Sequence, residues 1–171
     1  MTPAGKHFVE TCRATIIKNM QVRRIAFFLN FEPNPPTVTH QEKKVRVVNG
    51  KPMFYMPPEL KEARALFTAK IKPFAPPKPW DCPIMLCMSW RFCIPVSRRA
   101  KNDVEWIWKT TKPDLDNLRK MVPDIMTECG FWKDDSLLCL VVEEKKEYPS
   151  NTKHGVLISI TDLSQTQGES T

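Results

Sequence analysis

Apolar and polar residues alternate most regularly between Ile84 and Ile94. A large apolar side chain stands at every second position, and this period puts the large side chains on one face of a β-strand. We therefore predict a core strand over Ile84–Ile94. Shorter apolar runs predict further strands from Val22, over Leu137–Val142 with the charged extension Glu143–Tyr148, and over Val156–Ile160.

Two stretches have the period of an amphipathic helix. The second of them is predicted over Leu115–Cys129, followed by Gly130, and it contains Pro123. We expect Pro123 to bend this helix, because its ring clashes with the carbonyl of Arg119. The first helix opens at Pro57-Pro58 and is expected to bury a stripe of four residues, Leu60, Ala63, Phe67 and Ile71.

The connecting segments carry turn signals of their own. Lys43–Tyr55 is predicted to be a β-hairpin, because Asn49-Gly50 suits a type I′ turn, in which both central residues need a positive φ. Pro73–Pro83 is predicted to be a stiff connector. Ser97–Asp103 is polar and basic and predicts a surface loop, and Val104–Trp108 is strand-like.

The length of 171 residues suits one domain with its own core. We expect a domain over residues 20–162, an N-terminal extension over 1–19 and a polar C-terminal tail over 163–171. No apolar run reaches the roughly 20 residues of a membrane helix, and the N-terminus lacks the apolar stretch of a secretory signal. The sequence therefore predicts a cytoplasmic protein.

The net charge of +7 is unevenly distributed. Residues 1–112 carry a net charge of +12, and residues 113–171 carry −5. A basic part joined to an acidic part suits a polyanion-binding surface next to a cation-binding centre, although an uneven solvated surface is also compatible with it. The six cysteines form no C-x-x-C pair and the three histidines lie far apart, which argues against a zinc site and for reduced thiols.

Two acidic clusters flank the second predicted helix. Asp114 and Asp116 lie at its start, and Asp134 and Asp135 follow its end. Two carboxylates about 4 Å apart repel by roughly 4 kcal/mol at an effective dielectric of 20, and a divalent cation between them removes this cost. Magnesium prefers such oxygen ligands and, in nucleases, activates the attacking water and stabilises the leaving oxygen. The clusters therefore suggest a metal centre.

Lys120 lies one helical turn after Asp116, where it is suited to contact a scissile phosphate, and Asn117 is suited to orient a ligand or a water. The helix between the clusters is about 22 Å long at 1.5 Å per residue. The clusters meet only if the chain folds back after the helix. Convergence of Asp114, Asp116 and Asp135 on one ion is therefore a requirement of the metal hypothesis.

Each of these residues also has a plainer interpretation. Asp114 could simply cap the helix, and Asp116 could favour its positive end. Asp134-Asp135 could form an ordinary turn, and Lys120 could pair with Asp116 or Asp124. A D-x-D pair also serves glycosyltransferases and phosphatases, so the carboxylates alone do not define the reaction.

The order and spacing of these residues resemble the RusA family of Holliday-junction resolvases. The matching residues are Thr110–Lys120, which contain D-L-D-N-L-x-K, and Gly130–Asp135, which read G-x-x-x-D-D. The resemblance is strong over residues 108–148, looser over 22–107 and absent over 1–19. It implies an α/β (α+β) fold, in which a mixed sheet packs against two main helices, and a homodimeric endonuclease. Pro123 departs from the family pattern, which affects the expected helix geometry and not the ligands.

The resemblance also implies roles for individual residues. Asp114, Asp116 and Asp135 would be the essential metal-binding carboxylates, Lys120 the essential lysine, and Asp134 a supporting carboxylate. Magnesium is the expected cofactor, and manganese is expected to substitute for it.

Basic residues are the expected DNA contacts, and they lie in the predicted hairpin and in the loop after the long strand: Lys43, Lys44, Arg46, Lys51, Arg98, Arg99 and Lys101. The expected substrate is branched DNA such as a four-way junction, cut by paired nicks within a two-fold dimer. Trp106 and Trp108, with Phe54 and Tyr55, are candidates for the dimer interface or, alternatively, for the core.

The sequence supports two other classes of function less well. A catalytically silent accessory protein that binds branched DNA is disfavoured by the intact carboxylate set. A D-x-D nucleotidyl- or glycosyltransferase is disfavoured because the chain lacks a glycine-rich phosphate loop.

Overall fold

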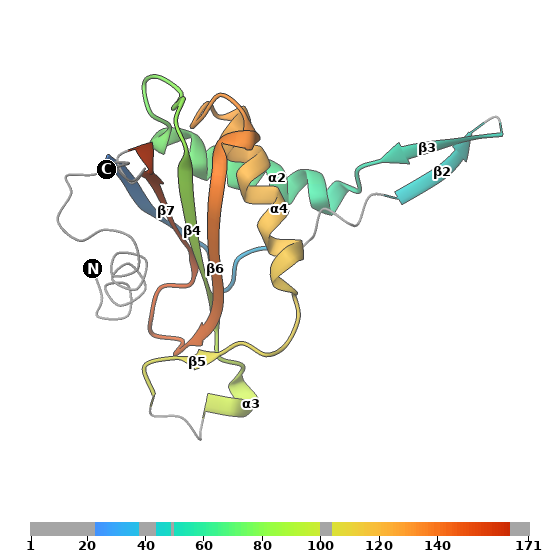
Figure 1. Ribbon diagram of the computed structural model, residues 1–171. Helices are drawn as coiled ribbons and strands as arrows, with labels where there is room; N and C mark the ends of the chain where they lie inside the picture. Colours follow the sequence, from blue (N-terminus) through green and yellow to red (C-terminus); the bar gives the residue numbers. More distant parts are fainter. Residues whose placement is uncertain (1–22, 38–43, 49, 100–103, 165–171) are drawn as a thin grey trace. The chain divides into compact units, whose positions relative to one another are not determined.

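The computed structural model describes residues 23–37, 44–48, 50–99 and 104–164 (Figure 1). Their contacts divide the chain into two compact units, which are described separately. The first unit comprises residues up to 35, 81–110 and those from 136 on, and the second comprises 36–80 and 111–135. The expected extension over 1–19 and most of the expected tail lie outside the described residues, so the predicted domain boundaries stay a prediction.

The first unit is built on a five-stranded sheet with the order β1-β7-β4-β6-β5. Its strands are β1 (Arg24–Asn30), β4 (Ile84–Cys93), β5 (Ile107–Trp108), β6 (Leu138–Tyr148) and β7 (Gly155–Asp162). β4 pairs in parallel with β6, whereas the other neighbours are antiparallel. The sheet is therefore mixed, and together with the helices it confirms the expected α+β class. β5 is shorter than the predicted strand over Val104–Trp108.

β4 lies between β7 and β6 and is buried on both faces. The large apolar residues share one face, as the alternation predicts. The opposite face includes Arg91, which is only 8% exposed. The guanidinium carbon of Arg91 lies 5.3 Å from the ring centroid of Phe28 on β1 and 5.1 Å from that of Tyr148 on β6, so aromatic rings from two strands accommodate the buried charge.

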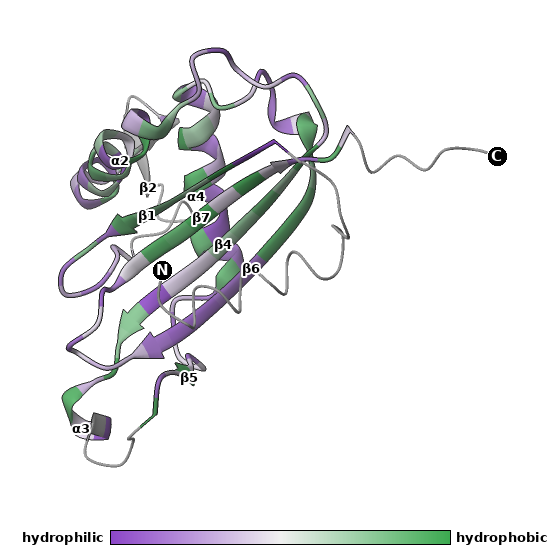
Figure 2. Cartoon of the chain, turned by 90° about the vertical axis from the view of Figure 1, so that its left-hand side faces the viewer, coloured by the Kyte–Doolittle hydropathy of each residue, from purple (hydrophilic) through white to green (hydrophobic). Residues whose placement is uncertain are grey.

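The burial of β6 differs from the expectation from the sequence. Its apolar first half was predicted to be buried, but Leu138–Val142 are partly or largely exposed. Within the charged extension, Glu143–Lys145 are also only partly buried, whereas the last three residues are buried, with Lys146 4% exposed and Glu147 fully buried. Figure 2 shows that β6 is hydrophilic in the half next to β5. Ion pairs with neighbouring side chains make this burial possible.

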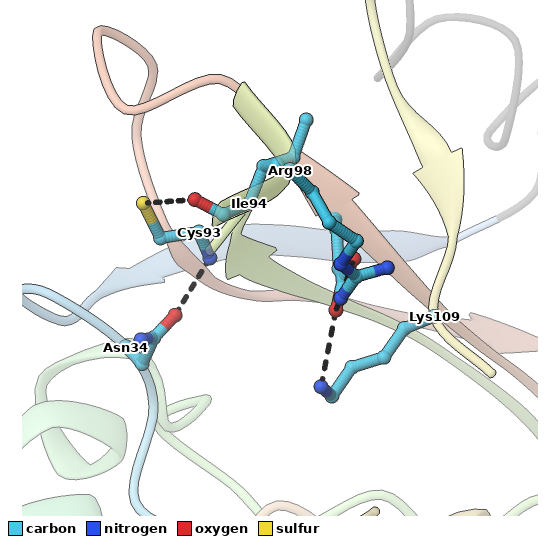
Figure 3. Close-up of polar contacts among 6 residues, drawn as sticks. Asn34, Cys93, Ile94, Arg98 and Lys109 are labelled. Atoms are coloured by element: carbon cyan, nitrogen blue, oxygen red, sulfur yellow. Dashed lines mark hydrogen bonds and ion pairs between the residues drawn. The ribbon is translucent and has the colours of Figure 1, made fainter. Parts of the chain in front are cut away.

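Glu147 is the centre of a buried ion cluster, and its two partners Arg98 and Lys109 are labelled in Figure 3. Its Oε1 accepts a hydrogen bond of 2.9 Å from Arg98 Nη2 and one of 3.2 Å from Lys109 Nζ. Its Oε2 lies 2.8 Å from the same arginine nitrogen, at an angle that does not make a hydrogen bond. Arg98 belongs to a short helix, α3 (Val96–Arg99), so the expectation of a loop starting at Ser97 is wrong for these residues. The pairing with Glu147 joins this polar segment to β6.

Replacing Glu147 by glutamine is expected to lower the free energy of unfolding by about 2–4 kcal/mol, because Arg98 and Lys109 lose the carboxylate that compensates their charges. Urea unfolding of the purified protein measures the change. The matched control is Glu62→Gln, which makes the same chemical change at an exposed position. Equal unfolding midpoints for the two variants would show that the cluster does not stabilise the sheet.

The second unit contains a two-stranded hairpin, β2 (Lys44–Val48) and β3 (Lys51–Tyr55). The two strands pair antiparallel, and the ribbon projects from the start of the helix that follows it (Figure 1). Gly50 has φ +74°, as the predicted turn requires, whereas Asn49 lies outside the described residues. The predicted hairpin is therefore confirmed over its described residues.

Two long helices form the rest of the second unit, α2 (Pro58–Ile71) and α4 (Leu115–Glu128). They pack against each other, and Arg64 on α2 forms an ion pair with Glu128 on α4. The buried residues of α2 are the four that the periodicity predicts. α4 continues through Pro123 as one helix and ends before Gly130, which has φ +80°. Two 3-10 turns complete the elements, η2 (Lys72–Phe74) and η3 (Asp135–Leu137).

Residues near the C-terminal end of the described chain are held to the sheet. The backbone N–H of Leu163 donates to the carbonyl of Pro83 at 2.8 Å, and Leu163 packs against Met85 and Cys87. Leu163, the first residue of the expected polar C-terminal tail, is therefore held to the sheet. Among the described helices, none has the length and apolar character needed to cross a membrane.

Candidate active site

Asp114 and Asp116 lie at the N-terminal end of α4. Asp114 occupies the N-cap position with an extended backbone, φ −76° and ψ 151°, but its side chain makes no capping hydrogen bond. Asp116 lies in the first turn, and both side chains are exposed. The positive end of the helix stabilises negative charge at this place. The plainer interpretation of Asp114 as a capping side chain is therefore not supported.

Asn117 allows a test of whether a divalent cation suits this place. Its amide oxygen Oδ1 is buried and has no hydrogen-bond partner within the described residues. An unsatisfied buried acceptor costs about 1–3 kcal/mol, which a cation or its bound water would relieve. With the carboxylates of Asp114 and Asp116, this oxygen gives the kind of donor set that magnesium prefers. The residues at the start of α4 therefore fit a hard divalent ion.

Lys120 is exposed on α4, one helical turn after Asp116. In the described part of the chain, no ion pair joins Lys120 to a carboxylate. The alternative in which Asp116 or Asp124 neutralises Lys120 is therefore not supported. An exposed ammonium beside two exposed carboxylates is suited to bind a phosphate that bridges to a carboxylate-bound cation.

Asp135 lies at the other end of α4. Its Oδ1 accepts a hydrogen bond from Thr127 Oγ1, in the last turn of the helix, and one of 3.1 Å from Trp132 Nε1. Gly130 reverses the chain direction after the helix, and the following residues return only as far as this last turn. Asp134, next to Asp135, is exposed.

The two acidic clusters are consequently separated within one chain. From Asp114 to Thr127, the partner of Asp135, α4 rises about 20 Å at roughly 1.5 Å per residue. Within the described residues, no group of three or more His, Cys, Asp or Glu side chains is placed to hold a metal ion. The expectation that Asp114, Asp116 and Asp135 converge on one ion is therefore wrong for a single chain. The fold-back after α4 exists, but it covers too little of the helix.

The basic residues predicted to contact DNA belong to both units. Lys44 and Arg46 lie on β2 and Lys51 on β3, so three of them share the projecting ribbon. Arg99 lies on α3, whereas Lys43 and Lys101 lie outside the described residues. Arg98 is bonded to Glu147, so its charge is already compensated within the fold.

Trp106 and Trp108 form a T-shaped pair with ring centroids 5.0 Å apart. Lys146 Nζ lies 4.1 Å from the ring centroid of Trp106 and 4.9 Å from that of Trp108, and it also pairs with Glu144 at 2.9 Å. Trp108, on the edge strand β5, is 57% exposed. It is therefore a surface residue, and the alternative of core packing does not apply to it.

Sequence reasoning missed the residues that hold Asp135. Thr127 was not singled out, and Trp132 was noted only as part of the G-x-x-x-D-D segment. A signal was present, since tryptophan carries one N–H donor that usually finds an acceptor when the ring is buried. An aspartate three residues later is a candidate acceptor, but only the turn after α4 defines the contact.

Comparison with known proteins gives two matches. The family model described as Endodeoxyribonuclease RusA matches residues 33–161. A curated protein of Lactococcus phage r1t, described as crossover junction endodeoxyribonuclease rusA, is 31% identical over an alignment of 143 residues, which covers 80% of this chain and 98% of the phage protein. Both acidic clusters and the strands from β2 to β6 lie inside the matched range.

Proposed function

This chain belongs to the RusA family of endodeoxyribonucleases, and we propose that it resolves Holliday junctions and related branched DNA by paired nicks. Family membership confirms the resemblance detected in the sequence and the expectation of a nuclease. The proposal includes a role in DNA recombination and repair in the cytoplasm, and a phage or prophage origin, since the phage relative is a crossover junction enzyme by its description.

One observation carries the proposed chemistry. The carboxylates of Asp114 and Asp116 stand exposed at the start of α4, without the capping bond that would explain Asp114 structurally. Within the described residues, these carboxylates make no capping bond and Asn117 Oδ1 has no hydrogen-bond partner, so their place at the positive end of a helix suits cation binding. The same arrangement disfavours a catalytically silent DNA-binding protein.

The proposed roles of the residues follow from their chemistry. Asp114 and Asp116 hold the cation, and Asn117 orients a bound water or the cation itself. When bound, magnesium, or manganese in its place, polarises the phosphoryl oxygens and activates the attacking water. Lys120 contacts the scissile phosphate and stabilises negative charge that develops on it during hydrolysis.

Asp135 enters the proposed site through a second copy of the chain. Because the length of α4 keeps Asp135 away from Asp114 within one chain, a site that uses both must combine two subunits. In the proposed homodimer, Asp135 of the partner subunit, supported by Asp134 of the partner subunit, completes the site that Asp114 begins. A two-fold dimer then presents two equivalent sites to a two-fold symmetric junction. The exposed Trp108 is a candidate interface residue.

The proposed function is tested by cleavage of duplex, fork and four-way junction DNA in magnesium and in EDTA. We expect symmetric paired nicks in the four-way junction, weak cleavage of the duplex and no cleavage in EDTA. Binding of the junction without cleavage in either magnesium or manganese would instead identify a silent accessory protein. Equal cleavage of the duplex and the junction would contradict the proposed specificity for branched DNA.

The projecting ribbon predicts a salt-dependent contact with DNA. A two-stranded ribbon fits the major groove, and each lysine or arginine that neutralises a phosphate releases counterions. Lys44→Ala and Arg46→Ala should each lower the slope of log affinity against log salt by roughly one. Fluorescence anisotropy with a labelled junction measures the slope. Lys153→Ala removes an equal charge from an exposed turn and is the control. Unchanged slopes in both ribbon variants would exclude a phosphate contact there.

A further inference from the structure

Asp135 has an asymmetric environment. Its Oδ1 accepts two hydrogen bonds, from the Thr127 hydroxyl and from the Trp132 indole, whereas its Oδ2 accepts none from the described residues. The indole N–H is shared between two acceptors, because Trp132 Nε1 also lies 2.6 Å from Thr127 Oγ1. The hydroxyl proton can reach either Asp135 Oδ1 or the Pro123 carbonyl at 3.1 Å, and the charged carboxylate is the stronger acceptor. The three side chains thus form one connected network.

The donors of this network are rigidly placed. Trp132 is 1% exposed, and its backbone forms a parallel bridge with Trp80. The backbone N–H of Trp80 donates to the carbonyl of Phe131 at 2.9 Å, and the backbone N–H of Lys133 donates to the carbonyl of Trp80 at 3.0 Å. Backbone hydrogen bonds of the residues before and after Trp132 therefore hold its indole in place, and Thr127 is held by the last turn of α4. Asp135 itself is exposed, so without these bonds its carboxylate would rotate freely.

We propose that Trp132 and Thr127 are positioning residues that occupy Oδ1 of Asp135 and thereby reserve Oδ2 for the divalent cation. The inference rests on the proposed function, in which Asp135 is a ligand. A carboxylate with one oxygen bonded to the protein loses less freedom when the other oxygen binds a cation. Charge-assisted bonds to Oδ1 also keep the carboxylate oriented. The network is thus a built support for one ligand.

The test measures cation binding directly, without DNA or cleavage. Manganese binding to the full-length protein is followed by electron paramagnetic resonance of the free ion. Trp132→Phe keeps the aromatic ring but removes the N–H, and Thr127→Val keeps the shape but removes the hydroxyl. Loss of such a supporting bond typically weakens metal affinity 10- to 100-fold, so we expect about a 10-fold increase in the dissociation constant for each variant. Thr127→Ser keeps the hydroxyl and should keep the manganese affinity of the wild-type protein.

Trp90 provides a matched control elsewhere in the chain. It is also a fully buried tryptophan whose Nε1 donates to a carboxylate, Glu143 Oε1, at 2.8 Å. Trp90→Phe therefore removes the same kind of bond and should lower the unfolding temperature without changing manganese affinity. If Trp132→Phe fails to fold, which circular dichroism reports, Thr127→Val and Thr127→Ser still decide the question.

The outcomes separate this inference from the proposed function. Asp135→Asn is the reference, because it removes the ligand charge itself. Weaker manganese binding in Asp135→Asn, Trp132→Phe and Thr127→Val, but not in Trp90→Phe, supports the inference. Weaker binding in Asp135→Asn alone overturns the positioning role and leaves the proposed function intact. Unchanged binding in Asp135→Asn overturns both the positioning role and the assignment of Asp135 as a ligand.

Discussion

Chains carrying Asp114→Asn and chains carrying Asp135→Asn are each expected to be inactive as homodimers but to regain nicking when the two are mixed. In the proposed dimer, each site takes Asp114 from one subunit and Asp135 from the other. A mixed dimer then has one site with both substitutions and one site with neither. Statistical mixing makes half of the dimers mixed, so about a quarter of the wild-type number of sites is restored.

The expected gain in cleavage on mixing is large because each substituted homodimer alone has almost no activity. Loss of a carboxylate that holds the catalytic cation should lower cleavage at least about 10³-fold, since that cation supplies the nucleophile and stabilises the transition-state charge. The substrate is a supercoiled plasmid with a cruciform. The single intact site of a mixed dimer should relax the plasmid, whereas wild-type dimers should linearise it by paired cuts.

A control and an opposing outcome complete this experiment. Mixing Asp114→Asn with Asp116→Asn chains should restore nothing, because every dimer then has one substituted carboxylate in each site. If Asp114→Asn and Asp135→Asn also fail to complement after verified subunit exchange, the site does not combine two subunits. Asp135 would then act within its own chain or not at all.

Replacement of Gly155 by alanine is expected to lower the free energy of unfolding by about 3–5 kcal/mol. Gly155 has φ +147°, and an added Cβ would lie 1.9 Å from the backbone oxygen of Leu29. Leu29 belongs to β1, whose residue Asn30 pairs with Gly155 in the sheet. Because the contact is with backbone, relief requires β1 to move away from β7, which breaks the ladder between them.

Gly50 provides the matched control for this prediction. It also has a positive φ, +74°, but no atom lies within 4 Å of an added Cβ. Gly50→Ala should therefore cost only the backbone preference, about 1–2 kcal/mol. Urea unfolding of both variants measures the difference. Similar midpoints would mean that β1 adjusts to the extra atom easily.

Sequence periodicity correctly predicted the helix and the strand that bury a regularly spaced apolar face. The stripe of α2 and the alternation of β4 gave correct elements because a single buried face repeats with the period of its structure. The hairpin was predictable because Gly50 needs a conformation that few other residues adopt. The resemblance in the acidic segments likewise led to the correct family.

The remaining features depend on contacts between distant residues, which a local pattern does not contain. Glu147 is buried because Arg98 and Lys109 reach it from other elements, and no period in β6 indicates this. The position of Asp135 depends on how far the chain returns after Gly130, a distance that composition does not determine. Sequence analysis therefore named the carboxylates at both ends of α4 but wrongly expected them to meet within one chain.

The place of β7 in the sheet has a consequence for how the protein is made. β7 is the last of the described strands to be synthesised, yet it lies between β1 and β4. Among the described strands β1 is the first to be synthesised and pairs with β7 alone, so it cannot pair until the ribosome has completed the segments between them. Such long-range pairing is slow, and until it forms, the edges of β1 and β4 are open to other chains. Premature termination before Gly155 should therefore yield aggregation-prone fragments and not a partly active nuclease.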